Sequence, residues 1–321
     1  MQEIDQYYIS ESLSFLKERV ILSGSLSENR ETKEQDTITL TNPSPNPLQP
    51  NPASVNVHKT LKGYGIVVSP IPYAAVYYGH SETSLPVVAV NTSASTSPAT
   101  GFGLPPTQDS KQDEAGIRFK TLDGRSTATV DYFQAYQSNN SIPNPANLAL
   151  LPGQASFPLL FANVVSRGWE YEFNTAITPQ LSILGTYTHF KISNAYGQDL
   201  RAVAQSEGAI YANYRFTSGD LKGFQAGVGV VHVSRRAVDS PTAGSTAAGT
   251  PANPIIFQPS AYLPAYTVVN LTSSYQLNAQ WRVAAYVDNL FNEYYFTGAL
   301  NRFNVFSGGL RGYRASVTYA F

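Results

Sequence analysis

The run LRGYRASVTYAF, residues 310–321, alternates between apolar and polar side chains from its third residue to its end. Successive side chains of a β-strand point to opposite faces. One face would therefore carry Tyr313 and Val317, and the other would carry Arg314 and Thr318. The same period of two recurs in segments elsewhere, at 204–217, 264–276 and 281–289. The pattern predicts antiparallel strands with one apolar face and one polar face.

The composition narrows the class of protein. The 321 residues include 13% charged and 42% hydrophobic ones, no cysteine, and a net charge of −1. Soluble domains carry about 25% charged residues, and a nucleic-acid-binding surface needs a basic field. No apolar run reaches the roughly 18 residues of a membrane-spanning helix. The absence of cysteine excludes disulfide scaffolds, Cys-ligated zinc sites and iron–sulfur clusters.

Short turns and long connections alternate along the chain. We predict about thirteen strands, at 4–11, 18–28, 63–69, 73–83, 112–121, 125–137, 164–176, 181–192, 204–217, 223–235, 264–276, 281–289 and 310–321. Long connections rich in Pro, Ser, Asn and Gly are predicted at 29–62, 85–111, 138–163, 193–203, 237–262 and 291–309. Short turns at one rim and long loops at the other are typical of outer-membrane barrels. The fold class predicted is all-β, an antiparallel transmembrane β-barrel, with aromatic residues at the strand ends forming interface girdles.

The strand count predicts that the barrel is partial. The last strand follows a long loop and runs inward, so a count of thirteen places the first residue on the extracellular side. Self-contained bacterial barrels have an even number of strands, with both ends periplasmic. We therefore predict that residues 1–321 are the C-terminal portion of a larger barrel. Residues 1–20 show no basic segment followed by an apolar core, so no signal peptide is expected.

Several runs resemble the strand signatures of TonB-dependent outer-membrane receptors. They are LPAYTVVN (263–270), WRV (281–283) with DNLFNEYY (288–295), GYRASVTYAF (312–321), SRGWEYE (166–172), and DYF (131–133) with Asn139. The resemblance covers 7–321 and is strongest over 163–321. It implies a barrel of roughly twenty-two strands, of which this chain would supply about thirteen. The family's plug domain and its energy-coupling box have no match in the sequence.

The resemblance also implies a function. Such receptors take up scarce, bulky nutrients, most often ferric siderophores, and sometimes cobalamin, haem or glycans. The expected partners are outer-membrane lipid and a ferric siderophore or similar ligand. The TonB complex and a plug would join only where the N-terminal part is supplied. No cofactor, no metal site and no nucleic-acid partner is expected, and the localisation implied is the outer membrane of a Gram-negative bacterium.

Two groups of residues are candidates for contact with a ligand. Aromatic residues in the long connections are predicted to stack on it or enclose it: Tyr196, Phe257, Tyr262, Tyr295, Phe303 and Phe306. Lumen-facing charges are predicted to steer a ligand or hold a plug: Glu170, Glu172, Arg215, Arg282 and Arg314. The alternatives are that the aromatic residues pack loop against loop or lie at the membrane interface, and that the charges form a solvated network. The segment 289–291 is interpreted as a folding element.

The sequence offers little for catalysis. His58, His80, His189 and His232 are scattered, without metal-ligand spacing. No Gly-x-Ser-x-Gly elbow is present. Three alternatives to a receptor stay open: a passive pore, an outer-membrane hydrolase with a Ser–His pair assembled across strands, and an inactive truncated fragment.

Overall fold

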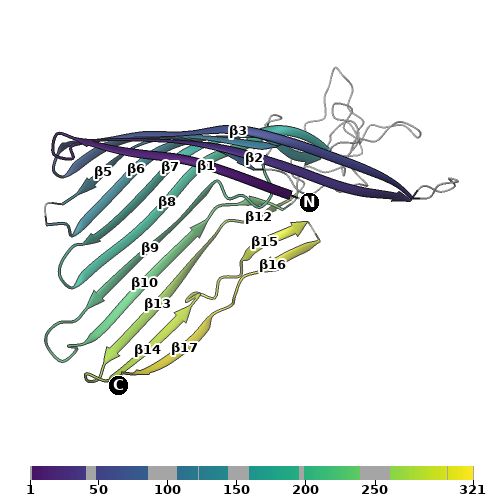
Figure 1. The fold of residues 1–321 in the computed structure, drawn as a ribbon. Coiled ribbons are helices and arrows are strands. Elements are labelled where there is room, and N and C mark those ends of the chain that lie inside the picture. The colour runs from purple at the N-terminus through teal and green to yellow at the C-terminus, as the bar shows by residue number, and fades with distance from the viewer. Residues whose placement is uncertain are drawn as a thin grey trace, which may run out of the picture.

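The computed structural model describes residues 2–40, 48–85, 107–121, 123–143, 159–194, 199–238, 261–301 and 303–320. Thirteen strands form one antiparallel sheet, and its order follows the chain from β1 at one edge to β17 at the other. The sheet curves from β1 at the top of Figure 1 to β17 at the bottom. The described residues thus form a partial barrel wall. None of them belongs to a helix that is long and apolar enough to cross a membrane.

The strands of the large sheet are joined as successive hairpins. They are β1 (Gln2–Phe15), β2 (Val20–Leu40), β3 (Leu48–Ile71), β4 (Ala74–Leu85), β5 (Gln108–Lys120), β6 (Ser126–Pro143), β7 (Leu159–Ala176), β8 (Leu181–Asn194), β9 (Ser206–Arg215), β10 (Phe224–Val233), β13 (Tyr266–Gln276), β14 (Trp281–Asp288) and β17 (Gly312–Tyr319). Two small sheets lie in the long connections. They pair β11 (Arg236–Ala237) with β12 (Tyr262–Leu263), and β15 (Phe296–Asn301) with β16 (Asn304–Ser307).

The predicted thirteen-stranded antiparallel sheet is confirmed. Short turns join the strands at one rim of the sheet, and the strand ends that flank the long connections lie at the other rim (Figure 1). β1 begins at the rim of the long connections, and β17 ends at the rim of the short turns, as the predicted strand directions require. We call these the loop rim and the turn rim.

The predicted long connection at 29–62 is wrong. β2 and β3 pair without interruption from Val20 opposite Val68 to Leu40 opposite Leu48. β2 has 21 residues, or about 70 Å at the usual rise per residue, whereas about 9–11 tilted residues cross the hydrocarbon. The polar, proline-containing sequence was typical of a loop. A backbone ladder outside the membrane needs no apolar face, so its sequence carries no alternation.

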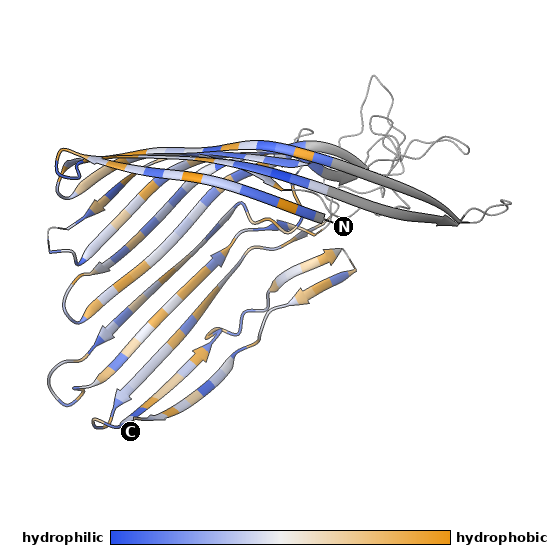
Figure 2. Ribbon diagram, in the orientation of Figure 1, coloured by the Kyte–Doolittle hydropathy of each residue, from blue (hydrophilic) through white to orange (hydrophobic). Residues whose placement is uncertain are grey.

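The sheet has two chemically distinct faces, and hydropathy alternates along the strands (Figure 2). Apolar residues meet in register on one face, in pairs such as Trp281–Tyr319, Val283–Val317 and Val287–Tyr313. The other face carries the polar partners, including Arg282 opposite Thr318 and Tyr286 opposite Arg314. Since lipid accepts the apolar side chains, we call these the outer face and the lumen face.

Aromatic residues form two rows on the outer face. The row near the turn rim contains Phe15, Phe119, Phe224, Tyr275, Trp281 and Tyr319. A second row lies further along the same strands and contains Tyr64, Tyr78, Tyr132, Trp169, Tyr187 and Tyr313. Aromatic rows that bracket an apolar band are the girdles that outer-membrane barrels place at the two lipid interfaces.

Besides Glu31, Asp131, Ser274 and Ala284 within the sheet, the best-buried side chains lie at the loop rim. They include Ala204, Val233, Arg236, Ala237, Val238, Leu263, Val268 and Asn289, each less than a tenth exposed. We refer to residues 199–205, 234–238, 261–265, 289–301 and 303–309 as the loop cluster. A sheet one layer thick buries little on its own, so the loop cluster provides most of the water-excluding core of the described chain.

Candidate functional site

The lumen face of β5, β6 and β7 carries a group of carboxylates, which we call the acidic patch: Glu114, Asp131, Glu170 and Glu172. Asp131 lies directly opposite Glu170 in the β6–β7 ladder. On its other side Asp131 faces Gly116 of β5, and Glu114 lies two residues from Gly116 along β5. The register therefore brings together acids that are far apart in the sequence.

A glycine and a tyrosine shape the centre of the acidic patch. A Cβ atom at Gly116 would lie 2.7 Å from Cβ of Asp131 and from the ring of Tyr77. The absent side chain gives Tyr77 room to lie across the strand, where its hydroxyl donates a hydrogen bond to Glu114 Oε1 at 3.0 Å. Asp131 is 7% exposed as a result. Its Oδ1 atom has no hydrogen-bond partner among the described residues.

The charge of the acidic patch is largely unbalanced. Arg118, whose guanidinium lies 5.8 Å from the centroid of the Tyr77 ring, is the cation nearest to it in the register. Within the described ranges, no ion pair joins the four carboxylates to a cation. No three His, Asp or Glu side chains there are placed to hold a metal ion. An unsatisfied buried carboxylate oxygen is costly, so the patch suits a guanidinium or an ammonium group brought from outside.

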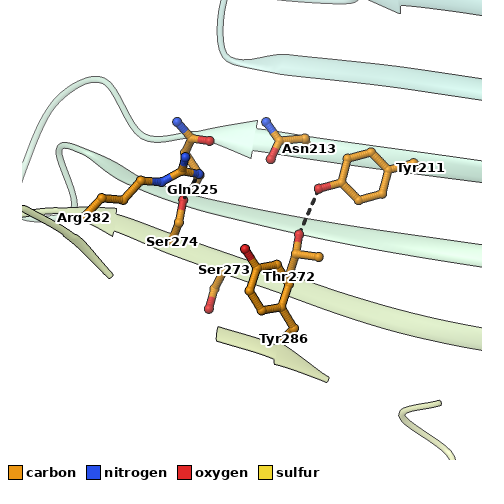
Figure 3. A pocket seen from close by; sticks show the side chains of 8 residues that line it. All are labelled: Tyr211, Asn213, Gln225, Thr272, Ser273, Ser274, Arg282 and Tyr286. Atoms are coloured by element: carbon orange, nitrogen blue, oxygen red, sulfur yellow. Dashed lines mark hydrogen bonds between the residues drawn. The ribbon is translucent and has the colours of Figure 1, made fainter. Parts of the chain in front are cut away.

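The lumen face of β9 to β14 has a different chemistry. Arg282 donates a hydrogen bond to Ser274 Oγ at 2.9 Å, and the hydroxyls of Tyr211 and Thr272 lie 2.8 Å apart (Figure 3). These four residues and their neighbours line a small polar cavity of about 140 Å³. A Cβ at Gly227 would collide with both hydroxyls, so a glycine is required beneath this pair.

The five lumen charges predicted from the sequence fall into two separate groups. Glu170 and Glu172 belong to the acidic patch, whereas Arg215, Arg282 and Arg314 lie on β9, β14 and β17. Arg314 is paired with Asp288 at 3.1 Å. Glu114 and Asp131 were missed by the sequence analysis. The same period of two applied to 112–121 and 125–137 would have placed both on the polar face.

The loop cluster is held by two arginines that bond to the backbone of the β15–β16 hairpin. Arg236 donates to the carbonyl of Phe296 at 2.6 Å and lies over the ring of Tyr266, 5.4 Å from its centroid. Arg201 donates to the carbonyl of Leu300 at 2.6 Å. The hairpin is thereby fixed to the connections on either side of β9 and β10.

The predicted aromatic residues occupy different positions. Tyr196 and Phe257 lie outside the described residues. Tyr262 donates a hydrogen bond to Asp199 Oδ2 at 3.1 Å, and the guanidinium of Arg235 lies 4.8 Å from its ring centroid. The Tyr295 and Tyr266 rings are 4.5 Å apart. Phe303 and Phe306, in contrast, are 89% and 47% exposed.

The four histidines are also separated. His58 contacts Glu28 and His80 contacts Asp113, while His232 contacts Thr267. His189 Nδ1 lies 2.6 Å from Ser206 Oγ, which is the type of contact that a hydrolase would need. This pair lies on the outer face, in the row of Trp169. That position faces the lipid boundary rather than the lumen.

The curved antiparallel sheet, its two girdles and its charged lumen face define the wall of an outer-membrane β-barrel. The family model for the TonB-dependent receptor-like β-barrel matches residues 2–290, and the chain belongs to this family. The family consists of receptors and transporters rather than enzymes, and the chain's location is the outer membrane of a Gram-negative bacterium.

Curated relatives share about a quarter to a third of the matched residues. The metal-pseudopaline receptor CntO of Pseudomonas aeruginosa is 30% identical over 211 residues, which are 64% of this chain and 27% of CntO. The ferrichrome outer membrane transporter/phage receptor of Escherichia coli K12 is 25% identical over 220 residues, 66% of this chain and 26% of the transporter.

A solved structure shares the fold along the entire chain. The ferric-catecholate import receptor Fiu of E. coli K12, in its closed form, superposes with a TM-score of 0.73 at 17% identity. The superposition covers 100% of this chain and 45% of Fiu. The chain thus spans less than half the length of each of these three proteins.

Proposed function

We propose that this protein takes part in the uptake of a ferric siderophore or a similar bulky metal chelate across the outer membrane. The observation that carries the proposal is the charged lumen face, together with a packed loop cluster at the loop rim that presents exposed aromatic side chains. The similarity to a metal-pseudopaline receptor and to a ferrichrome transporter supports this class of ligand.

The acidic patch has a role in this proposal. Its unsatisfied Asp131 oxygen and the facing Glu170 would receive cationic side chains of a plug domain that fills the lumen. We further propose that residues 1–321 supply the C-terminal part of the complete barrel. Movement of the plug would be driven through TonB, as the family's name implies.

The predicted ligand contacts divide by their surroundings. Phe303 and Phe306 expose their rings at the loop rim. In the proposal they contact the chelate, together with Tyr196 and Phe257. Tyr262 and Tyr295 are engaged within the loop cluster through Asp199 and Tyr266, and they would hold the contact surface in position.

Uptake in the native host tests the proposal. The gene is deleted, and radioactive metal delivered as ferrichrome, a ferric catecholate or metal-loaded pseudopaline is followed in iron-limited cells. We expect the deletion to abolish uptake of at least one chelate, a plasmid copy to restore it, and an uncoupler to block it. Unchanged uptake of all the chelates would contradict the proposal. Uptake that persists with the uncoupler present would favour a passive pore.

A further inference from the structure

Two cations face each other on the outer surface of β7 and β8. Arg167 and Lys191 are direct partners in the antiparallel ladder, one residue pair above Trp169 and His189 on the same face. Both side chains are exposed. Side chains in this arrangement are about 5 Å apart at Cβ, and like charges directly opposite each other destabilise a sheet.

The surroundings supply no counter-charge. Neither Arg167 nor Lys191 forms a hydrogen bond or ion pair in the described part of the chain. The residue opposite Arg167 on β6 is the neutral Gln134, and the group below Lys191 is His189, which contacts Ser206. The acid nearest in the ladder, Asp113 beyond Gln134, is already bonded to Tyr78 and His80.

Two other cations on the outer face have acidic partners. Arg30 lies 2.7 Å from Glu28, and Lys111 lies 3.8 Å from Glu82. These pairs lie on β2, β4 and β5, beyond the same aromatic girdle. The pair on β7 and β8 differs from these two, because its cations lie directly opposite each other without an acidic partner among the described residues.

The pair lies at the level of the lipid headgroups. Below Arg167 the outer positions of β7 are Trp169, Tyr171, Phe173 and Thr175. Arg167 is about ten residues from the turn-rim end of β7, the length that a tilted strand needs to cross the hydrocarbon. The Trp169 and Tyr132 rings, 5.2 Å apart in an edge-on contact, mark the interface itself.

We propose that Arg167 and Lys191 form a binding site for the phosphate groups of a lipid in the outer leaflet. A guanidinium binds phosphate through two parallel hydrogen bonds, and an ammonium adds a point charge. Gln134 provides a neutral donor beside them, and Trp169 packs against the start of the acyl chains. One phosphorylated headgroup between the two cations removes their mutual repulsion and fixes the lipid at β7–β8.

The full chain, folded in a non-ionic detergent, tests the site by native mass spectrometry. The probes are lipid A with two phosphates, the same lipid without phosphate, and inorganic phosphate. We expect the phosphorylated lipid to bind about tenfold more tightly than the dephosphorylated one. The double variant R167Q/K191Q should lose this preference. The control R30Q/K111Q removes two paired cations from the same face and should keep it.

Each result is informative. Equal binding of the two lipids by the unmodified chain would overturn the proposal, as would an equal loss in the control variant. Displacement of the lipid by equimolar inorganic phosphate would show a phosphate site rather than a lipid site. The single variants R167K and K191R keep both positive charges. They provide the test if the double variant does not fold. R167K should weaken binding more than K191R, because it removes the planar fork.

Discussion

The side chain of Asn270 on β13 accepts a hydrogen bond from the backbone N–H of Asn289 at 2.9 Å, just where β14 ends. Asn289 is 2% exposed and has a φ of 52°, in the left-handed region. Its own side chain accepts from the N–H of Glu293 at 2.8 Å and donates to the carbonyls of Glu293 and Gly309. One strand therefore sets the path of the loop that leaves its neighbour.

Replacing Asn289 by Ala should destabilise the loop cluster by about 2 kcal/mol or more, because three hydrogen bonds are lost and Ala disfavours a positive φ. Limited proteolysis of 290–309 measures the opening. Asn270→Asp retains the accepting oxygen and should leave the cleavage rate nearly unchanged, whereas Asn270→Ala should raise it. Equal rates for the two Asn270 variants would contradict the assigned role of this oxygen.

Gly116 and Gly79 form a matched pair on the lumen face of neighbouring strands. A methyl group at Gly116 meets Asp131 and Tyr77, whereas nothing lies within 4 Å of one at Gly79. Gly116→Ala should therefore destabilise the sheet by about 1–3 kcal/mol through overpacking. Gly79→Ala should be neutral or slightly stabilising. Urea unfolding followed by tryptophan fluorescence compares them, and an equal effect of the two changes would argue against the crowding.

Glu170→Gln should stabilise the chain, by up to about 1 kcal/mol, because it removes the repulsion with the buried Asp131 directly opposite. Glu207→Gln provides the control, since Glu207 also faces the lumen but lies opposite Thr188 and Val233. Thermal unfolding of the chain in detergent gives both values. A lower unfolding temperature for Glu170→Gln would mean that this carboxylate has a cationic partner within the chain.

Asp123 in the β5–β6 turn predicts a dependence on pH. Thr121 donates to Asp123 Oδ1 at 2.5 Å, and Arg125 bonds to the same carboxylate through its backbone N–H and its side chain. These hydrogen bonds lower the pKa of Asp123 below its ordinary value, and the bond from Thr121 has the largest effect. A carboxylate with a lowered pKa stabilises the fold above its unfolded pKa of about 3.9. That contribution is lost as the pH falls through the lower folded value.

The unfolding rate of the Asp123→Asn variant should therefore depend less on pH than that of the unmodified chain between about pH 5 and pH 2. Asp220→Asn in the β9–β10 turn removes a carboxylate that lacks these hydrogen bonds and is the matched control. Identical profiles for Asp123→Asn and the unmodified chain would mean that the turn does not contribute to acid unfolding.

Phe303 and Tyr295 separate ligand contact from loop packing. Phe303→Ala should weaken chelate binding severalfold and lower the unfolding temperature less than Tyr295→Ala, because the Phe303 ring is 89% exposed. Tyr295→Ala should lower the unfolding temperature, because its ring packs on Tyr266. Binding is measured on whole cells with the chelate that the deletion experiment identifies. Unaltered binding by Phe303→Ala would remove this residue from the proposed contact surface.

The sequence predicted the sheet well because membrane strands must alternate. Residues such as Trp281, Val283 and Tyr319 repeat at a spacing of two since one face meets lipid. The halves of β2 and β3 nearer the loop rim extend beyond the lipid, and their sequence does not alternate. We therefore interpreted them as a loop. The first strand, predicted at 4–11, continues to Phe15, because the turn at Leu16, Lys17 and Glu18 has a positive φ at each residue without the Gly, Asn or Asp that usually marks it.

The candidate site was less accessible to sequence reasoning. Glu170 and Glu172 were placed on the lumen face, but their meeting with Asp131 and Glu114 depends on the register between strands. A slip of one residue would move each of these side chains to the opposite face, and loop lengths do not determine that register. The cation pair of Arg167 and Lys191 was missed for the same reason.

The loop cluster has a consequence for how the protein enters the membrane. The turn rim is made of short hairpins, while most of the best-buried residues lie at the loop rim. The segments that carry Arg236, Leu263 and Asn289 must cross the bilayer before these three residues can pack together. Once packed, the cluster contains the bonded guanidinium groups of Arg201 and Arg236, whose return through the hydrocarbon would be costly. Packing of the loop cluster therefore opposes withdrawal of the inserted strands, and insertion is favoured in one direction without an external source of energy.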